Sequence, residues 1–571
     1  MRKIKKILGW GVVFASIFIS FAGGFPYGQP KEIPKTLAVM KEEMQRNFDA
    51  LQKEQIPPYF MSYSIDQVST QMVTGSFGAV SSKDENKTAY LQIDVRVGSY
   101  HLDNSHELRG DPLGRSRVIA GGSSRSPLDE APEALQVLLW QGTDRAYKNA
   151  LDILARVKSE KTLKVEEEDK SDDFSKVESH TAIAKPLTLK VDLEKWAAKI
   201  RKYSEPFRAY PFMMSASASF VNEVRNKYLV NTEGTMILTP VNYMRLQISV
   251  TAKGDDGMEF PLYASYFGFQ ESDLPSDDRV LKDVDSMAAT LEKLRAAPLV
   301  DPYTGPAILS GKASGVFFHE ILGHRLEGHR QKSAQEGQTF KKKVGELVLP
   351  DFISVVFDPT LKELGGFKLS GNYEFDEEGT KAEKVDCIDK GIMKNFLMSR
   401  TPIENFGHSN GHARGMPGMK PVCRQSNLIV ESTKKLDEAK LRRMLIEECT
   451  KQNKPFGLVF QEIAGGFTLT GRTAPNAFNV TPLVVYRVYT DGRPDELVRG
   501  VDLIGTPLTT FSKIIATGAQ PDVFNGMCGA ESGSVPVSAV SPSILVSEIE
   551  VQKKAKSQEK LPILPPPPVK K

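Results

Sequence analysis

The segment at residues 307–329, AILSGKASGVFFHEILGHRLEGH, decides the architecture of the second half of the chain. Residues 307–310 predict a strand, and the apolar run that follows predicts a helix. This helix carries His319 and Glu320, and His324 comes shortly after them. The two imidazoles offer nitrogen ligands to a metal ion, and the carboxylate beside them can accept a proton from an attacking water. The segment therefore predicts a strand and a helix that carry metal-dependent hydrolytic chemistry.

The spacing of the two histidines exceeds the zinc-protease pattern H-E-x-x-H by one residue. In an ideal α-helix, residues four apart are offset by about 40° around the axis, whereas residues five apart are offset by about 140°. A regular helix would therefore point His319 and His324 away from each other. A π-bulge can absorb one extra residue, and Gly323 makes such a distortion easier. We predict a π-turn or a helix break across residues 321–324.

Two nitrogens do not complete a catalytic zinc site, which usually has three protein ligands and one open position. Spacing alone leaves several candidates for the third ligand: Glu327, His329, His408, His412 and the cysteines. Cys528 lies between glycines, which let the backbone bring a thiolate close to a metal. The alternative is a helix that binds no metal. However, His319 and Glu320 follow Phe317 and Phe318, and burying these polar groups without partners would be costly.

The composition is that of an ordinary globular chain with one unusual end. Its 571 residues are 40% hydrophobic and 25% charged, and the net charge of +3 is too even to argue for a nucleic acid partner. Residues 1–24 place basic residues before an apolar run and small residues, which is the layout of a signal peptide. We therefore expect an exported protein, periplasmic or extracellular, with no membrane span once the signal is removed. Export would expose the four cysteines, Cys387, Cys423, Cys449 and Cys528, to an oxidising environment.

The periodicity of the chain divides it into an α+β half and a mostly β half. Helical patterns occupy residues 33–55, 129–158, 192–203 and 284–295, and strand patterns occupy residues 59–102 and 215–267. From residue 306 the chain changes to short apolar strands punctuated by glycine. We expect a signal peptide at 1–24, an N-terminal α+β domain at 28–300, a mostly β domain at 301–552 and a Pro/Lys-rich flexible tail at 553–571.

Several segments together resemble the TldD/PmbA family of metallopeptidases. They are His319-Glu320-x-x-Gly323-His324 with Leu326-Glu327-Gly328, residues 375–380 (FDEEGT) with 389–392 (DKGI), residues 410–414 (NGHAR), and residues 526–529 (GMCG) with 535–537 (VPV). They follow one another in the family's order and span roughly residues 200 to 550. Each motif is modest by itself, and the set is specific.

The resemblance implies that His319, His324 and Cys528 bind Zn²⁺ and that Glu320 is the general base. It also implies an N-terminal α+β domain, a mostly β C-terminal domain that carries the metal site, and a dimer, either a homodimer or a heterodimer with a family paralogue. The implied substrates are peptides or unfolded polypeptides held in extended form along a strand edge. Two features depart from the family: His329 replaces an acidic residue, and the better-known members look cytoplasmic.

Two other interpretations remain open. A dipeptidyl peptidase III type of exopeptidase shares the His-Glu-Ile-Leu-Gly-His stretch, and residues 447–449 (EEC) resemble its third-ligand motif, but the gap between the two is too long. A non-catalytic binding or scaffolding protein would hold a structural zinc or none. Arg414 and Arg424 could orient a substrate carboxylate, although we expect arginines of this kind to be surface residues more often.

Overall fold

The computed structural model describes residues 33–108, 124–127, 131–162, 169–472, 478–505, 510–554 and residue 564. An α+β part extends to about residue 300 and a mostly β part follows it, so the predicted fold class is confirmed. The expected signal peptide at 1–24 and most of the expected tail lie outside the described residues. Within the described residues, no helix is both long enough and apolar enough to cross a membrane.

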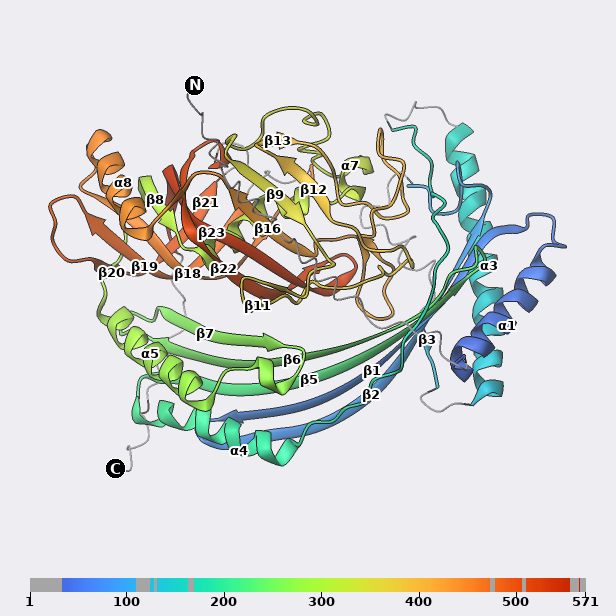
Figure 1. Ribbon diagram of the computed structural model, residues 1–571, viewed down its shortest axis with the longest axis horizontal. Coiled ribbons are helices and arrows are strands. Elements are labelled where there is room, and N and C mark those ends of the chain that lie inside the picture. Colours follow the sequence, from blue (N-terminus) through green and yellow to red (C-terminus); the bar gives the residue numbers. More distant parts are fainter. Residues whose placement is uncertain are drawn as a thin grey trace, which may run out of the picture.

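A curved, mostly antiparallel sheet is the frame of the N-terminal part (Figure 1). Its long strands are β1 (Pro58–Ser76), β2 (Ala79–Val97), β5 (Met213–Asn231) and β6 (Met236–Lys253), with β7 (Glu259–Gly268), β3 (Ser124–Arg125) and β4 (Thr181–Ile183) at the margins. Leu91, Ile93 and Val95 alternate with more exposed residues along β2 and are buried, as their pattern predicts. The expectation of strands at 59–102 and 215–267 is therefore confirmed.

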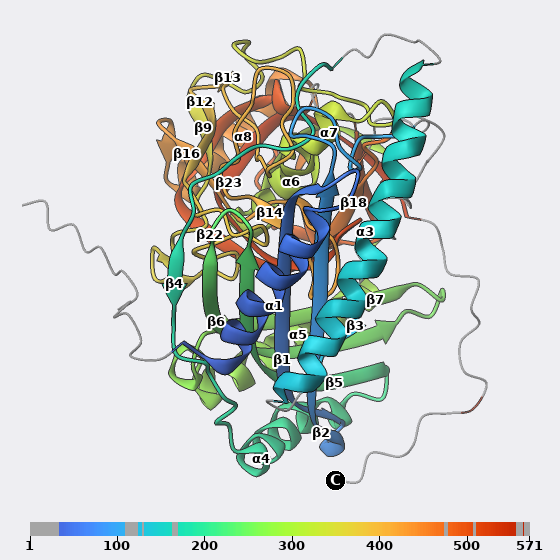
Figure 2. The same ribbon diagram turned by 90° about the vertical axis from the view of Figure 1, so that its right-hand side faces the viewer.

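Helices cover the outer face of this sheet, whereas the C-terminal part lies over its concave face (Figures 1 and 2). They are α1 (Lys35–Leu51), α3 (Pro132–Thr162), α4 (Leu193–Ser204) and α5 (Asp277–Ala296). The first three confirm the helical predictions closely. Helix α5 begins earlier than residue 284, because the Ser276 side chain accepts a hydrogen bond from the Arg279 amide and caps the helix there.

The C-terminal part is built around a closed ring of strands. β8 (Tyr303–Leu309), β18 (Phe456–Thr468), β19 (Phe478–Tyr489), β21 (Val501–Gly505) and β23 (Gly533–Lys553) pair in turn, and β23 returns to β8. β23 also pairs with β22 (Ile514–Ala530) in a long hairpin, and β16 (Asn427–Ser432), β9 (Ile353–Phe357) and β12 (Val385–Asp389) extend the sheet. Helix α6 (Gly311–Ile321) shares one hydrophobic core with these strands, whereas α8 (Glu438–Lys451) packs against a separate cluster.

The remaining elements of the C-terminal part are short. They are α7 (His329–Lys332), the 3-10 turn η3 (Gly323–Leu326), β10 (Glu363–Leu364), β11 (Phe367–Lys368), β13 (Ile392–Met393), β14 (Ala413–Arg414), β15 (Val422–Cys423), β17 (Lys435–Leu436) and β20 (Glu496–Val498). In the N-terminal part, the 3-10 turns η1 (Glu205–Ala209) and η2 (Glu271–Asp273) precede β5 and α5.

Candidate metal centre

Helix α6 holds the first histidine deep inside the C-terminal part. Every residue of the helix except Lys312 is buried, and Ser310 caps its start by accepting a hydrogen bond from the Ala313 amide. The helix lies close to β23, because a Cβ atom at Gly315 would come within 2.9 Å of the Ala539 carbonyl oxygen. His319 is therefore carried on a helix that the surrounding strands hold rigidly.

The helix breaks where the spacing of the histidines requires it. Helix α6 ends at Ile321, and the chain continues as the 3-10 turn η3, so the predicted break is confirmed. Arg325 donates hydrogen bonds to the Ile321 and Glu320 carbonyls at 2.9 and 3.3 Å, which satisfies acceptors that the helix leaves free at its end. The imidazole centroids of His319 and His324 are consequently 5.1 Å apart.

Gly323 allows this break for a reason that the sequence does not show. A Cβ atom at this position would lie 1.9 Å from the side-chain oxygen of Gln425. The Gln425 amide in turn donates to the His319 carbonyl at 3.2 Å. Glycine is needed here because another side chain occupies the space, and we expected only that it would ease a backbone distortion.

The β22–β23 hairpin brings Cys528 to the two histidines. Cys528 Sγ lies 3.5 Å from His324 Nε2, and the three potential ligand atoms lie within 4.8 Å of one another. In a tetrahedral zinc site with these ligand types, donor atoms are about 3.3 to 3.6 Å apart. His319 Nδ1 is buried without a hydrogen-bond partner in the described part of the chain. The three side chains are therefore grouped closely enough to hold one divalent ion, and the pair of Cys528 and His324 already has the spacing of such a site.

The electrostatics of the cluster favour the thiolate form of the cysteine. Burial by itself raises the pKa of Cys528, but the interactions of its sulfur with His324 and His319 outweigh burial and hold this pKa well below its usual value. Burial lowers the pKa of His324, and Cys528 and Glu327 reverse that effect and raise it to about 10. A thiolate is the form of cysteine that binds metal ions.

Glu327 contacts the His324 ring and Arg424 contacts the sulfur of Cys528. The Glu327 carboxylate lies 3.3 Å from His324 Nδ1 and accepts a hydrogen bond from Arg330 Nε at 2.7 Å. Burial alone raises the pKa of Glu327, but His324, Arg330 and Arg424 lower it to about 2, so the residue is a carboxylate. Arg424 donates to Cys528 Sγ at 3.2 Å. Glu327, which we considered as a ligand, instead orients His324, and Arg424 is buried rather than on the surface.

The structure places the other candidate ligands elsewhere. His412 is buried between Asn410 and the Ser426 hydroxyl, and burial lowers its pKa to about 3. His408 is exposed, and Glu531 pairs with His329 at the tip of the β22–β23 hairpin. The thiols of Cys387, Cys423 and Cys449 are free and buried. Glu448, the residue of the dipeptidyl peptidase III interpretation, lies on α8 and accepts hydrogen bonds from Gln452 and Lys451.

Glu320 follows the first histidine and is 9% exposed. No hydrogen bond joins its carboxylate to the described part of the chain. In the described part of the chain, its carboxylate is therefore not held by a hydrogen-bond donor.

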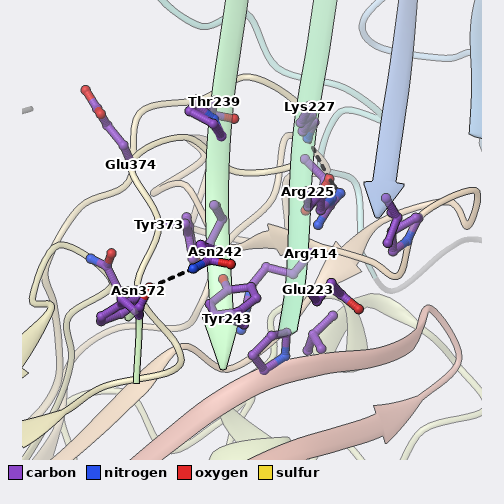
Figure 3. A pocket seen from close by; sticks show the side chains of 18 of the residues that line it. Glu223, Arg225, Lys227, Thr239, Asn242, Tyr243, Asn372, Tyr373, Glu374 and Arg414 are labelled. Carbon is purple, nitrogen blue, oxygen red and sulfur yellow. Dashed lines mark hydrogen bonds and ion pairs between the residues drawn. The ribbon is translucent and has the colours of Figure 1, made fainter. Parts of the chain in front are cut away.

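A large pocket lies between the sheet of the N-terminal part and the C-terminal part. This interdomain pocket has a volume of about 730 Å³ and is lined by residues of β5 and β6, by residues 372–377, by residues 414–417 and by the β22–β23 hairpin (Figure 3). Met527, the neighbour of Cys528, lines it and is 56% exposed. The pocket therefore reaches the strand that carries the cysteine of the cluster.

The motif at residues 375–380 builds one wall of this pocket. The Asp376 carboxylate accepts hydrogen bonds from the backbone amides of Glu378 and Thr380 at 2.9 Å and of Ala413 at 3.0 Å. Gly379 has φ +80°, a conformation that suits glycine. The motif thus fixes the position of β14, and with it the side chain of Arg414.

Comparison with known proteins agrees with this architecture. A family described as the PmbA/TldA metallopeptidase C-terminal domain matches residues 302–553. A protein named "Metalloprotease" from Archaeoglobus fulgidus is 30% identical over 239 residues, which cover 42% of this chain and 51% of that protein. A "Zinc metalloprotease TldD homolog" from Saccharolobus solfataricus is 22% identical over 63% of this chain and 75% of that protein. The chain thus spans about half the length of the first relative and three quarters of the second.

The fold has a counterpart among solved structures. TldE from Thermococcus kodakarensis superposes with a TM-score of 0.59 at 11% sequence identity, over 90% of this chain and 100% of that chain. Residues 302–553 therefore carry a metallopeptidase-type C-terminal domain beneath which a curved α+β part lies. Residues 302–553 belong to the TldD/PmbA family.

Proposed function

We propose that the protein is a zinc-dependent peptidase in which His319, His324 and Cys528 hold the metal. The observation that carries the proposal is the convergence of these three ligand atoms within 4.8 Å, and Glu320 directly follows the first of the three ligand residues in the chain. A zinc ion held there would polarise the scissile carbonyl and make water more acidic. The relatives named as metalloproteases support the same class of activity.

The side chains of the protein then have distinct roles. Glu320 accepts the proton of the attacking water and later passes it to the leaving amine. Glu327 keeps His324 oriented through its Nδ1 atom, so that Nε2 faces Cys528. Arg424 donates a hydrogen bond to the thiolate and reduces its charge. Because a thiolate neutralises part of the metal charge, we expect modest rates on generic substrates.

We propose peptides or unfolded polypeptides as substrates, bound in extended form along β22. Residues 521–530 of β22 pair with β23 along one edge, and the described strands leave the other edge of this stretch unpaired. A free strand edge can bind an extended peptide through main-chain hydrogen bonds. This edge carries Met527 and Cys528 and borders the interdomain pocket, so a peptide bound there would reach the metal.

The assembly and the compartment remain part of the proposal. We propose a dimer, either of two copies or with a family paralogue, and export to the periplasm or the cell exterior as residues 1–24 predict. The fold shared with TldE is compatible with a paralogous partner.

The Glu320→Gln variant tests the mechanism. We expect it to retain one zinc per chain and to lose hydrolysis of an unfolded polypeptide, whereas Cys528→Ser should lose zinc and Glu448→Ala should keep both zinc and activity. Full activity of Glu320→Gln would refute the assigned base. Zinc that depends on Glu448 would favour the dipeptidyl peptidase III interpretation, and a wild-type protein with no hydrolysis would favour a binding or scaffolding role.

A further inference from the structure

Arg414 is a buried cation that faces the interdomain pocket. Its side chain is only 6% exposed, yet it lines the cavity beside Tyr243 and Glu223 (Figure 3). An arginine this deeply buried normally has an anionic partner, because removing a charge from water costs several kcal/mol.

The partners of Arg414 in the protein do not neutralise it. Its Nη1 atom donates to the Gln425 carbonyl at 2.5 Å, and its guanidinium lies 4.8 Å from the centre of the Tyr373 ring. Among the described residues, no carboxylate forms an ion pair with it. Burial lowers the pKa of Arg414, which is the response of a cation whose charge is poorly compensated.

Glu377, a pocket carboxylate that interacts electrostatically with Arg414, already has other partners. Glu377 accepts from Arg225 at 2.8 Å and from Lys227 at 2.6 Å, so two other cations share its charge. These two cations are therefore satisfied, whereas among the described residues only the Gln425 carbonyl accepts a hydrogen bond from the five N–H donors of Arg414.

Arg414 is linked to the metal cluster through two neighbouring residues of the chain. Its acceptor Gln425 follows Arg424 in the chain, and Arg424 contacts the sulfur of Cys528. A peptide that extends from β22 into the pocket would pass this guanidinium. A cavity of about 730 Å³ has the size of a small-ligand site, so it suits a short chain end rather than a polypeptide that continues.

We propose that Arg414 binds the terminal α-carboxylate of the peptide substrate, so that the enzyme acts near free carboxyl ends. This inference rests on the proposed peptidase function. The planar guanidinium matches a carboxylate bidentately, and the Tyr373 ring behind it limits its movement. Tyr243 and other apolar lining residues receive the side chains of the last residues.

Equilibrium binding in the Glu320→Gln background tests the inference without requiring hydrolysis. Two peptides of one sequence are compared, one with a free carboxyl terminus and one with a terminal amide. We expect the free acid to bind at least about tenfold more tightly, as charge-assisted hydrogen bonds imply. Adding Arg414→Met should reduce the ratio of the two affinities to about one, and Arg414→Lys should retain part of it.

The matched control is Lys368→Met, which removes a pocket-lining cation that Glu363 already pairs; the ratio should be unchanged. An equal affinity of the wild-type pocket for acid and amide would overturn the inference, and so would a ratio that survives Arg414→Met. If Arg414→Met does not fold, the Arg414→Lys ratio decides instead. The wild-type pocket could instead bind amidated peptides with an internal Asp more tightly than those with Asn. If this preference disappeared in Arg414→Met, Arg414 would recognise acidic side chains, and the assignment to the terminal carboxylate would be refuted. If the wild-type protein keeps the preference for the free acid over the amide but hydrolyses no peptide, only the proposed peptidase function is refuted.

Discussion

Replacing Glu327 by Gln is the most revealing change to the surroundings of the metal cluster. The substitution keeps the shape of the side chain but removes the charge that faces His324 Nδ1, Arg330 Nε and Arg424 Nε at 3.3, 2.7 and 3.6 Å. Two buried guanidinium groups then lose their shared anion, which costs about 3 to 5 kcal/mol of folding stability. Loss of the group that orients a metal-binding histidine lowers metal affinity by about 10- to 100-fold, or about 1.4 to 2.7 kcal/mol.

Zinc titration against a competing chelator measures the affinity, and denaturant unfolding of the metal-free protein measures the stability. The control is Glu336→Gln, because Glu336 accepts from the same Arg330 at 2.8 Å but does not contact His324. We expect the control to lose some stability and to keep its zinc affinity. A Glu327→Gln protein that binds zinc within twofold of the wild type would show that this carboxylate does not orient the ligand.

Three further predictions follow from other parts of the site. Gly323→Ala places a methyl group 1.9 Å from the Gln425 side-chain oxygen. We therefore expect the free energy of unfolding, measured with denaturant, to fall by about 1 to 3 kcal/mol, and zinc binding to weaken. An unchanged denaturant midpoint would contradict the packing argument. Burial lowers the pKa of His329, but Glu531 reverses this and raises it from 6.5 to about 9. The stability that this pair contributes, about 2 to 3 kcal/mol, should be complete between about pH 4.5 and 6.5 and disappear as the pH rises through 9, and His329→Gln should unfold without this pH dependence. Removing zinc with a chelator should lower the melting temperature. If the free zinc concentration exceeds its Kd a thousandfold, the loss of folding free energy is about 4 kcal/mol. The Cys528→Ser protein should melt at the same temperature with and without chelator.

Local periodicity predicted most secondary-structure elements, because an apolar stripe depends only on neighbouring residues. Helices α1, α3 and α4 lie where their patterns place them, and the break after Ile321 follows from a five-residue spacing of histidines. The early start of α5 was missed, although Ser276 followed by Asp277 and Asp278 is a recognisable capping signal.

The arginines show where sequence reasoning failed. Arg414 and Arg424 were expected to be surface residues, and both are buried. Arg424 is stable inside the protein because residues more than 100 positions later accept its hydrogen bonds, namely Ser532, Gly533 and Cys528. The partners of a buried guanidinium come from the tertiary fold, and its own sequence neighbours do not reveal them.

The sequence alone determined the α+β class, the helix that carries His319 and the need for that helix to break before His324, since all three depend on short-range spacing. Cys528 was one candidate among several by spacing, and only the resemblance to a family selected it. The folded chain decided the rest: the β22–β23 hairpin carries a thiol across about two hundred positions to His324, and two domains enclose a pocket around Arg414. Contacts between such distant segments are set by the packing of whole sheets, and no local pattern of residues encodes them.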